Sequence, residues 1–221
     1  ASPRRFAVRL GEEREFGMNV SRRVLFGLTG AMAARGGDWP AFRGPNDNGV
    51  ANEQHAPVHW GPGENVRWKV PLPAPGNSSP IVVSGRVFIT CAENQGKKRS
   101  LYCFDRKTGS MIWNQTVEIE EVEPTHPTNP YCASTPVADE SRVIVWHGTP
   151  GLFCYDLNGA LVWHAHPGAV HHDWGYASSP IISHGKVLLN FGPGSRTALI
   201  AFDLNTGSQL WRFDEPGGLD T

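Results

Sequence analysis

Hydrophobic residues along the chain gather in short runs, which are separated by clusters of Gly, Pro, Ser, Asn and Asp. Short apolar runs bounded by turn residues predict β-strands joined by tight turns, so the chain is predicted to be all-β. From residue 79 onward the predicted strands come in groups of four. They lie at 79–83, 86–91, 101–105 and 111–116, then at 134–138, 142–147, 152–156 and 160–165, and finally at 177–182, 186–191, 198–203 and 209–213.

The last two strands of each group enclose a repeated turn. The pattern D-x-x-T-G-x-x-x-W occurs at 105–113 and 203–211, and 156–163 is the same unit with one turn residue fewer. Successive Trp residues are 50 and 48 positions apart, which is the period of a propeller blade. We expect Asp to accept hydrogen bonds from turn amides, Gly to adopt a positive φ, and Trp to cover the seam between sheets. These structural repeat positions are Asp105, Gly109, Trp113, Asp156, Gly159, Trp163, Asp203, Gly207 and Trp211.

The fold class that follows is a partial β-propeller of four-stranded antiparallel blades, with three full blades at 79–117, 134–165 and 177–213. The segment 66–71 matches an outer strand alone, and no turn or inner strands precede it. We interpret it as a closing strand that would complete the last blade of a ring. A ring of about seven or eight blades of this length needs roughly 340–400 residues, which is more than this chain contains. The chain is therefore expected to be the N-terminal part of a longer propeller.

The N-terminal region is read as targeting sequence followed by a leader. Residues 18–33 combine two arginines, a short apolar run and an Ala-x-Ala pattern, which is typical of a secretory signal peptide. The Sec and twin-arginine export routes both stay open. Residues 1–17 form an upstream extension that is left out of the fold prediction, and 34–65 form a leader segment. The apolar run is about half of what spans a bilayer, so no transmembrane anchor is predicted. The expected location is the bacterial periplasm or cell envelope.

Charge and cysteine content narrow the function classes. The chain has 20 Lys and Arg against 21 Asp and Glu, which argues against the basic surface of a nucleic-acid-binding protein. Its four Cys are too few for a disulfide-built scaffold of this size and contain no C-x-x-C pair. Cys91 and Cys103 fall on strands that should pair, so a disulfide between them is left open.

Two side-chain groups are candidates for chemistry. His164, His166, His171 and His172 form a His-rich segment that is a candidate metal site, but polar loop histidines in solvent explain the segment better, because no Cys or Glu neighbour completes a four-ligand set. The stretch 171–175 precedes an innermost strand and could reach the central channel. The acidic run Glu118, Glu120, Glu121 and Glu123 could serve acid/base chemistry or hold calcium, but its alternation with apolar residues favours a half-exposed strand.

With the repeats and the leader motif W-P-x-F-R-G-P at 39–45 in view, residues 38–221 resemble the PQQ-like β-propeller repeat family. The resemblance implies either an exported protein similar to the outer-membrane assembly factor BamB or a quinoprotein dehydrogenase that binds pyrroloquinoline quinone (PQQ) with calcium. Quinoproteins of this family have an adjacent Cys pair above the cofactor, and this chain has none. No Cys follows the signal segment before Cys91, so the lipid-anchoring Cys of the assembly factor is also absent. No catalytic, cofactor-binding or metal residue is therefore carried over.

The predicted function is an exported, non-catalytic propeller that serves as a scaffold for a protein or small-molecule ligand. The alternative is a PQQ-dependent or other oxidoreductase whose active site lies partly on blades beyond this sequence. The repeat pattern does not choose a substrate or partner in either case.

Overall fold

The computed structural model describes residues 5–7, 37–51, 57–169, 172–194 and 197–215. The predicted signal peptide and His171 lie outside these residues. Within them, no helix is long and apolar enough to cross a membrane. A single turn of 3-10 helix, η1 (Asn94–Gly96), accompanies the strands. The prediction of an all-β protein is confirmed.

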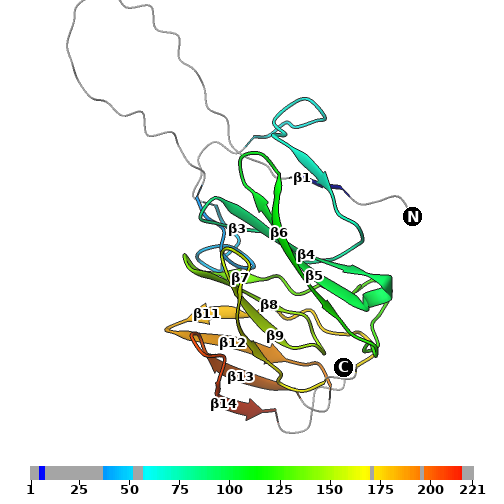
Figure 1. Cartoon of the computed structure of the whole chain (residues 1–221), viewed down its shortest axis with the longest axis vertical. Coiled ribbons are helices and arrows are strands. Elements are labelled where there is room, and N and C mark those ends of the chain that lie inside the picture. The colour runs from blue at the N-terminus through cyan, green and yellow to red at the C-terminus, as the bar shows by residue number, and fades with distance from the viewer. Residues whose placement is uncertain (1–4, 8–36, 52–56, 170–171, 195–196, 216–221) are drawn as a thin grey trace, which may run out of the picture.

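Three four-stranded antiparallel sheets make up most of the structure and lie stacked one after another (Figure 1). In each sheet the strands are hydrogen-bonded in chain order, as expected for propeller blades. The first blade contains β3 (Ile81–Val83), β4 (Arg86–Glu93), β5 (Lys98–Asp105) and β6 (Met111–Glu118). The second contains β7 (Val137–Ala138), β8 (Arg142–Trp146), β9 (Leu152–Asp156) and β10 (Leu161–Ala165). The third contains β11 (Ile181–Ser183), β12 (Lys186–Phe191), β13 (Ala198–Asp203) and β14 (Gln209–Asp214).

The middle strands of the first two blades are buried on both faces. The first blade lies between the second blade and the segment 68–74, and the second blade lies between the first and the third. On β4 and β5, Phe88, Leu101 and Cys103 pack against the second blade, whereas Val87 and Tyr102 belong to a separate cluster on the opposite face. This division follows the alternation of side chains along a strand. A third cluster joins the second and third blades through residues such as Trp146 and Phe191. The cores thus lie between sheets.

The outer-strand Trp of the first blade and that of the second blade each contact the turn of the next blade. Trp113 Nε1 donates to the carbonyl of Leu157 at 3.0 Å, and Trp163 Nε1 donates to that of Leu204 at 3.0 Å. Trp68, which precedes β2, makes the same 3.0 Å bond to Arg106 of the first blade. In every case the acceptor is the residue directly after the turn Asp. The indole also lies against the turn Gly of that blade, so close that a Cβ on Gly207 would be 2.6 Å from Trp163.

The turns themselves are closed by the repeated Asp. Asp105 Oδ1 accepts hydrogen bonds from the Lys107 and Thr108 amides at 2.9 and 2.7 Å. Asp203 makes the equivalent bonds in the third blade. Because the carboxylate is the accepting form, these bonds lower the pKa of both Asp side chains. The turn glycines have φ of 71° to 92°, which is the left-handed region that residues with a Cβ avoid.

The leader crosses the inner strands of the first two blades. Trp39 pairs with Val82 of β3 through two backbone bonds of 2.7 and 2.8 Å, and the Pro40 carbonyl accepts from Ala138 of β7 at 2.9 Å. Ala41 is buried in the core between the second and third blades. Asp38 accepts a bond from the Ser84 amide in the β3–β4 turn. The leader therefore occupies the axial face at the turn end of the blades.

The closing segment differs from the prediction of a strand without a mate. It forms a short strand, β2 (Lys69–Pro71), which pairs antiparallel with β1 (Arg5–Ala7). The fold prediction left out residues 1–17, so it did not include this pairing. Trp68, directly before β2, and Val70, within β2, pack on the outer face of the first blade.

The possibility of a Cys91–Cys103 disulfide is not realised. All four cysteines are free, and the β4–β5 register places Cys91 opposite Ser100 and Cys103 opposite Phe88. The two side chains also belong to different cores on opposite faces of the sheet. Strand pairing was predicted correctly here, but a disulfide also requires a matched register and a shared face.

The Trp–Gly contact can be tested with two glycines that share a backbone conformation. Gly207 (φ 71°) touches Trp163, whereas a Cβ added to Gly185 (φ 73°) would have no atom within 4 Å. We expect Gly185→Ala to lose about 1–2 kcal/mol of unfolding free energy from the left-handed conformation alone. Gly207→Ala should lose a further 1–3 kcal/mol or so, because its methyl group overpacks the indole. Urea denaturation of both variants measures the difference, and equal losses would contradict the interlock.

The outer face of the third blade leaves apolar side chains in solvent. Trp211 is 40% exposed, whereas its equivalent Trp163 is 7% exposed, and Phe213 is 63% exposed. Apolar surface of this kind favours self-association. We expect the purified chain to associate with rising concentration, and Trp211→Lys with Phe213→Lys to reduce that association. Sedimentation velocity measures the effect, with Val58→Lys as the control at an exposed apolar residue outside the blades. A wild-type chain that stays monomeric would contradict this expectation.

Candidate functional site

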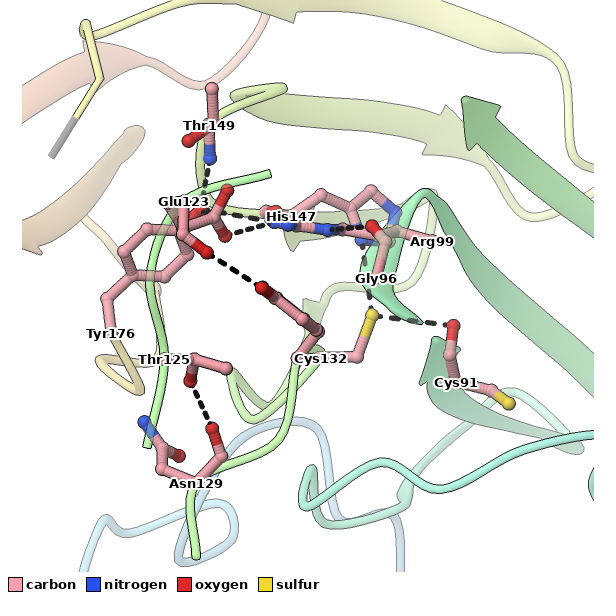
Figure 2. Close-up of polar contacts among 11 residues, drawn as sticks. Cys91, Gly96, Arg99, Glu123, Thr125, Asn129, Cys132, His147, Thr149 and Tyr176 are labelled. Carbon is pink, nitrogen blue, oxygen red and sulfur yellow. Dashed lines mark hydrogen bonds and ion pairs between the residues drawn. The ribbon is translucent and has the colours of Figure 1, made fainter. Parts of the chain in front are cut away.

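The long connections between blades meet at the end of the sheets opposite the Asp turns. Because antiparallel strands alternate in direction, the β5–β6 and β9–β10 turns lie at one end, and the segments 119–136 and 166–180 lie at the other. We call the second end the loop end. The leader forms its backbone hydrogen bonds near the turn end of the blades. The loop end is therefore less covered by the leader. The candidate site lies there (Figure 2).

A buried ion pair forms the base of the site. Arg99 at the start of β5 and Glu123 in the first connection are 1% and 4% exposed, and their Nη1 and Oε1 atoms are 2.5 Å apart. Arg99 also donates from Nε to the Gly96 carbonyl at 2.9 Å and from Nη1 to the His147 carbonyl, and it lies over the Tyr131 ring. Burial alone would raise the pKa of Glu123, but the hydrogen bond and charge of Arg99 hold that pKa below its usual value.

Tyr176 connects this ion pair to the second and third blades. Its hydroxyl donates to Glu123 Oε1 and accepts from the Thr149 amide, as Figure 2 shows. The ring stacks on Trp146 with a centroid separation of 4.6 Å. Gly148, at φ 78°, leaves the space that the hydroxyl occupies, since a Cβ there would overlap it. Burial raises the pKa of Tyr176 above its usual range, so the phenol remains a proton donor.

His147 and Cys132 lie beneath this network. His147 is 2% exposed, and burial together with the charge of Arg99 lowers its pKa to about 3. Cys132 Sγ lies 3.9 Å from His147 Nδ1 and donates to the Cys91 carbonyl at 3.4 Å. Burial raises the pKa of Cys132 to about 12. Neither group has the pKa of an active nucleophile or base near neutral pH.

A small cavity lies between these groups. Its lining includes Ser134, Trp146, His147, Gly175 and Tyr176, and its volume is about 10 Å³. That volume holds roughly one water molecule, whereas pockets for organic ligands are about 300–1,000 Å³. The described part of this site is thus packed for something no larger than a hydroxyl group.

Two stacked aromatic rings, one of them exposed, lie on the same connections. Trp174 is 52% exposed and stacks on His126 with a centroid separation of 4.2 Å. Asn129 Nδ2 donates to the Trp174 carbonyl at 2.7 Å, and His172 Nδ1 accepts from the Trp174 amide. These bonds fix a planar aromatic pair on the loop end. We call Trp174 and His126 the aromatic pair.

The His-rich segment is spread over several environments. His164 stacks on Phe153 and contacts the Pro150 carbonyl through Nε2 at 2.7 Å, while His166 is exposed and His172 bonds locally. Within the described ranges, no group of three or more His, Cys, Asp or Glu residues is placed to hold a metal ion. The metal-site interpretation stays a prediction because His171 is not described.

The residues of the acidic run lie in different environments. β6 ends at Glu118, which pairs with Lys98, so the residues that follow lie beyond the strand, and Glu123 is buried. The interpretation as one half-exposed strand is therefore wrong for Glu123. Sequence reasoning also missed Arg99, His147 and Tyr176. The isolated carboxylate directly before Pro124 was the available signal, but its partner is 24 residues away in sequence.

The quinone cofactor implied by the sequence resemblance does not fit the residues of this site. The four cysteines are separate and buried, so none forms an adjacent pair that could stack on a planar ring system. The cavity of about 10 Å³ is also far smaller than a tricyclic quinone requires. No reaction step through that cofactor follows from the described blades.

The buried neutral imidazole generates a prediction about pH. An unfolded His147 protonates below its ordinary pKa of 6.5, whereas the folded residue stays neutral to about pH 3. The unfolded state therefore binds more protons, and stability falls as pH drops below 6.5 by up to about 1.4 kcal/mol per pH unit. The carboxyl of Glu123 has a usual pKa of 4.5, so above about pH 5.5 it is mostly ionised in the folded and unfolded states and contributes little to this slope.

We expect His147→Asn to reduce the slope of unfolding free energy between about pH 6.5 and 5.5 by up to one proton. Chemical denaturation at several pH values measures it, with His164→Asn as the matched control at a stacked but exposed histidine. An unchanged slope in His147→Asn would mean that the imidazole is not held neutral.

Known proteins provide an independent comparison. A search of curated proteins found no match. Among solved structures, a europium-containing methanol dehydrogenase is 18% identical, with 65% of this chain and 25% of that chain covered and a TM-score of 0.49. A quinohemoprotein alcohol dehydrogenase from Comamonas testosteroni is 20% identical, with 64% and 21% covered and a TM-score of 0.47. BamB from Moraxella catarrhalis is 15% identical, with 68% and 55% covered and a TM-score of 0.44. The chain thus spans a quarter or less of the length of these dehydrogenases and about half of that BamB.

A family model described as outer membrane protein assembly factor BamB matches residues 58–121 and 97–220. These matches include all three blades and the strand that precedes them. Since they cover well over half of the chain, the protein belongs to the PQQ-like propeller family of the outer membrane protein assembly factor BamB.

Proposed function

We propose that the protein is an exported, non-catalytic propeller that binds a protein or ligand on its loop end. The observation that carries this proposal is the contrast between the two layers of the site. The inner layer is a closed network in which Arg99, Glu123 and Tyr176 hydrogen-bond to one another. In the outer layer, Trp174 is exposed to solvent and stacks on the half-buried His126.

The inner layer has no group suited to acid–base or nucleophilic catalysis near neutral pH. The carboxylate that could act as a base is ion-paired, the imidazole is held neutral to about pH 3, and the nearby thiol has a pKa of about 12. General acid–base and nucleophilic catalysis need groups that titrate near the working pH and reach the substrate. These groups instead join the first blade to the connections of the second and third blades.

The outer layer has the features of a recognition surface. Exposed aromatic rings bury a large area at low entropic cost when a partner covers them, and Trp is enriched among the residues that dominate binding energy. The backbone of Trp174 is fixed by Asn129 and His172, so its position is largely formed before binding. The family description refers to the outer membrane, which supports the expected location in the cell envelope.

The rival function is oxidoreductase activity with PQQ, and it has a direct test. The full chain is incubated with PQQ and Ca²⁺, dialysed, and examined for a bound chromophore and for dye-linked alcohol oxidation, with a quinoprotein dehydrogenase as the positive control. We expect neither signal. A retained chromophore together with alcohol-dependent dye reduction would overturn the non-catalytic proposal.

A further inference from the structure

Four residues that line the small cavity each have a polar side-chain atom with no hydrogen-bond partner among the described residues. The atoms are Ser134 Oγ, Trp146 Nε1, His147 Nε2 and Glu123 Oε2; the first three residues are 2% exposed, and Glu123 is 4% exposed. Because an unpaired polar group in a protein interior is unfavourable, four such residues around one cavity point to a ligand that pairs with several of these atoms.

The hydrogen-bonding character of each atom can be assigned. Trp146 Nε1 is always a donor, and the Ser134 hydroxyl can donate or accept. The Cys132 thiol donates to the Cys91 carbonyl, which leaves its sulfur as the acceptor for a proton on His147 Nδ1. In the neutral imidazole that tautomer makes Nε2 an acceptor. Glu123 Oε2 is a carboxylate oxygen and can only accept. The residues around the cavity therefore offer one donor, two acceptors and one group that can be either.

Charge and size restrict the ligand further. Arg99 and Glu123 neutralise each other beside the cavity, and His147 is neutral, so no uncompensated charge among these groups attracts an ion. The cavity volume of about 10 Å³ accommodates one oxygen-sized group. Trp146 is held in place by its stack on Tyr176, so the direction of its N–H is fixed.

We propose that this cavity is a binding site for one neutral hydroxyl group, which donates to His147 Nε2 and accepts from Trp146 Nε1. Water and the terminal hydroxyl of a small polyol both have this chemistry. The site is internal and distinct from the aromatic pair, so the proposal does not depend on the proposed function.

The test is NMR of the ¹⁵N-labelled full chain, which has 8 Trp indole signals. Trp146→Phe identifies the Trp146 signal by its loss. We expect that indole proton to show a nuclear Overhauser effect to water with the sign of a long-lived bound molecule. Trp113 and Trp163 are internal controls, because their indoles donate to protein carbonyls, and they should show no such effect.

Two variants of Ser134 distinguish an Overhauser effect from bound water from one relayed by an exchanging hydroxyl of the protein. An exchanging Ser134 hydroxyl could relay the water signal, so the effect must persist in Ser134→Ala, and its loss there would overturn the proposal. Ser134→Val adds methyl groups to the cavity and should abolish the effect, whereas persistence would mean that the signal arises elsewhere. Neither variant changes a residue of the Arg99–Glu123 pair. The indole signals of Trp113 and Trp163, which lie at the blade interfaces, report whether the fold is retained.

Addition of ethylene glycol distinguishes the two sources of the hydroxyl. A saturable shift of the Trp146 indole, with only linear solvent drift at Trp113 and Trp163, identifies a polyol hydroxyl as a ligand. No saturable shift with the water effect retained identifies water as the occupant, and both results support the site. Absence of both signals would overturn it.

Discussion

The contact of Trp68, Trp113 and Trp163 with the turn of the blade that follows each of them is the constraint on which the stacked sheets depend. The indole N–H is bonded to the carbonyl after the turn Asp, and the ring covers the turn Gly. A buried Trp needs a partner for its N–H, and a hairpin turn has carbonyls that its own ladder does not use. One side chain therefore satisfies hydrogen bonding and packing together. Because the contact is repeated at Trp68, Trp113 and Trp163, it sets the same spacing at each interface.

Among the described residues, the loop end has no contact that repeats from blade to blade. The Arg99–Glu123 ion pair joins neighbouring segments there, at a single position. Burying two charges costs several kcal/mol per ion, so such a pair is weak evidence for added stability. What it does provide is geometry. Arg99 bonds simultaneously to the first connection, to the backbone of the second blade and to Tyr176 before the third blade, which only one arrangement of the three segments permits. Removal of either charge would leave the other buried without compensation.

The fold was predictable from the sequence, and the inner layer of the site was not. Asp105, Gly109 and Trp113 recur with a blade period, and local turn chemistry explains each of them, so periodicity alone indicates four-stranded blades. Glu123 occurs once and lies in an acidic run that resembles a solvated strand. Its burial depends on Arg99 and Tyr176, which come from other elements. A tertiary contact that occurs only once produces no repeated sequence pattern, so its partners could not be predicted from periodicity. The Cys91–Cys103 question has the same cause, because register and face are set by the whole ladder.

The asymmetry between the two ends of the blades follows from these two kinds of contact. At the turn end, repeated Trp contacts and the leader segment 38–41 use the available backbone groups, so little remains for an external ligand. At the loop end the connections are longer and irregular, and they present side chains that vary from blade to blade. A repeat fold has similar blades by construction, so any specific recognition has to come from the segments that break the repeat. Trp174 and Glu123 both lie in such segments, which is why the exposed aromatic pair and the buried network occur at the same end.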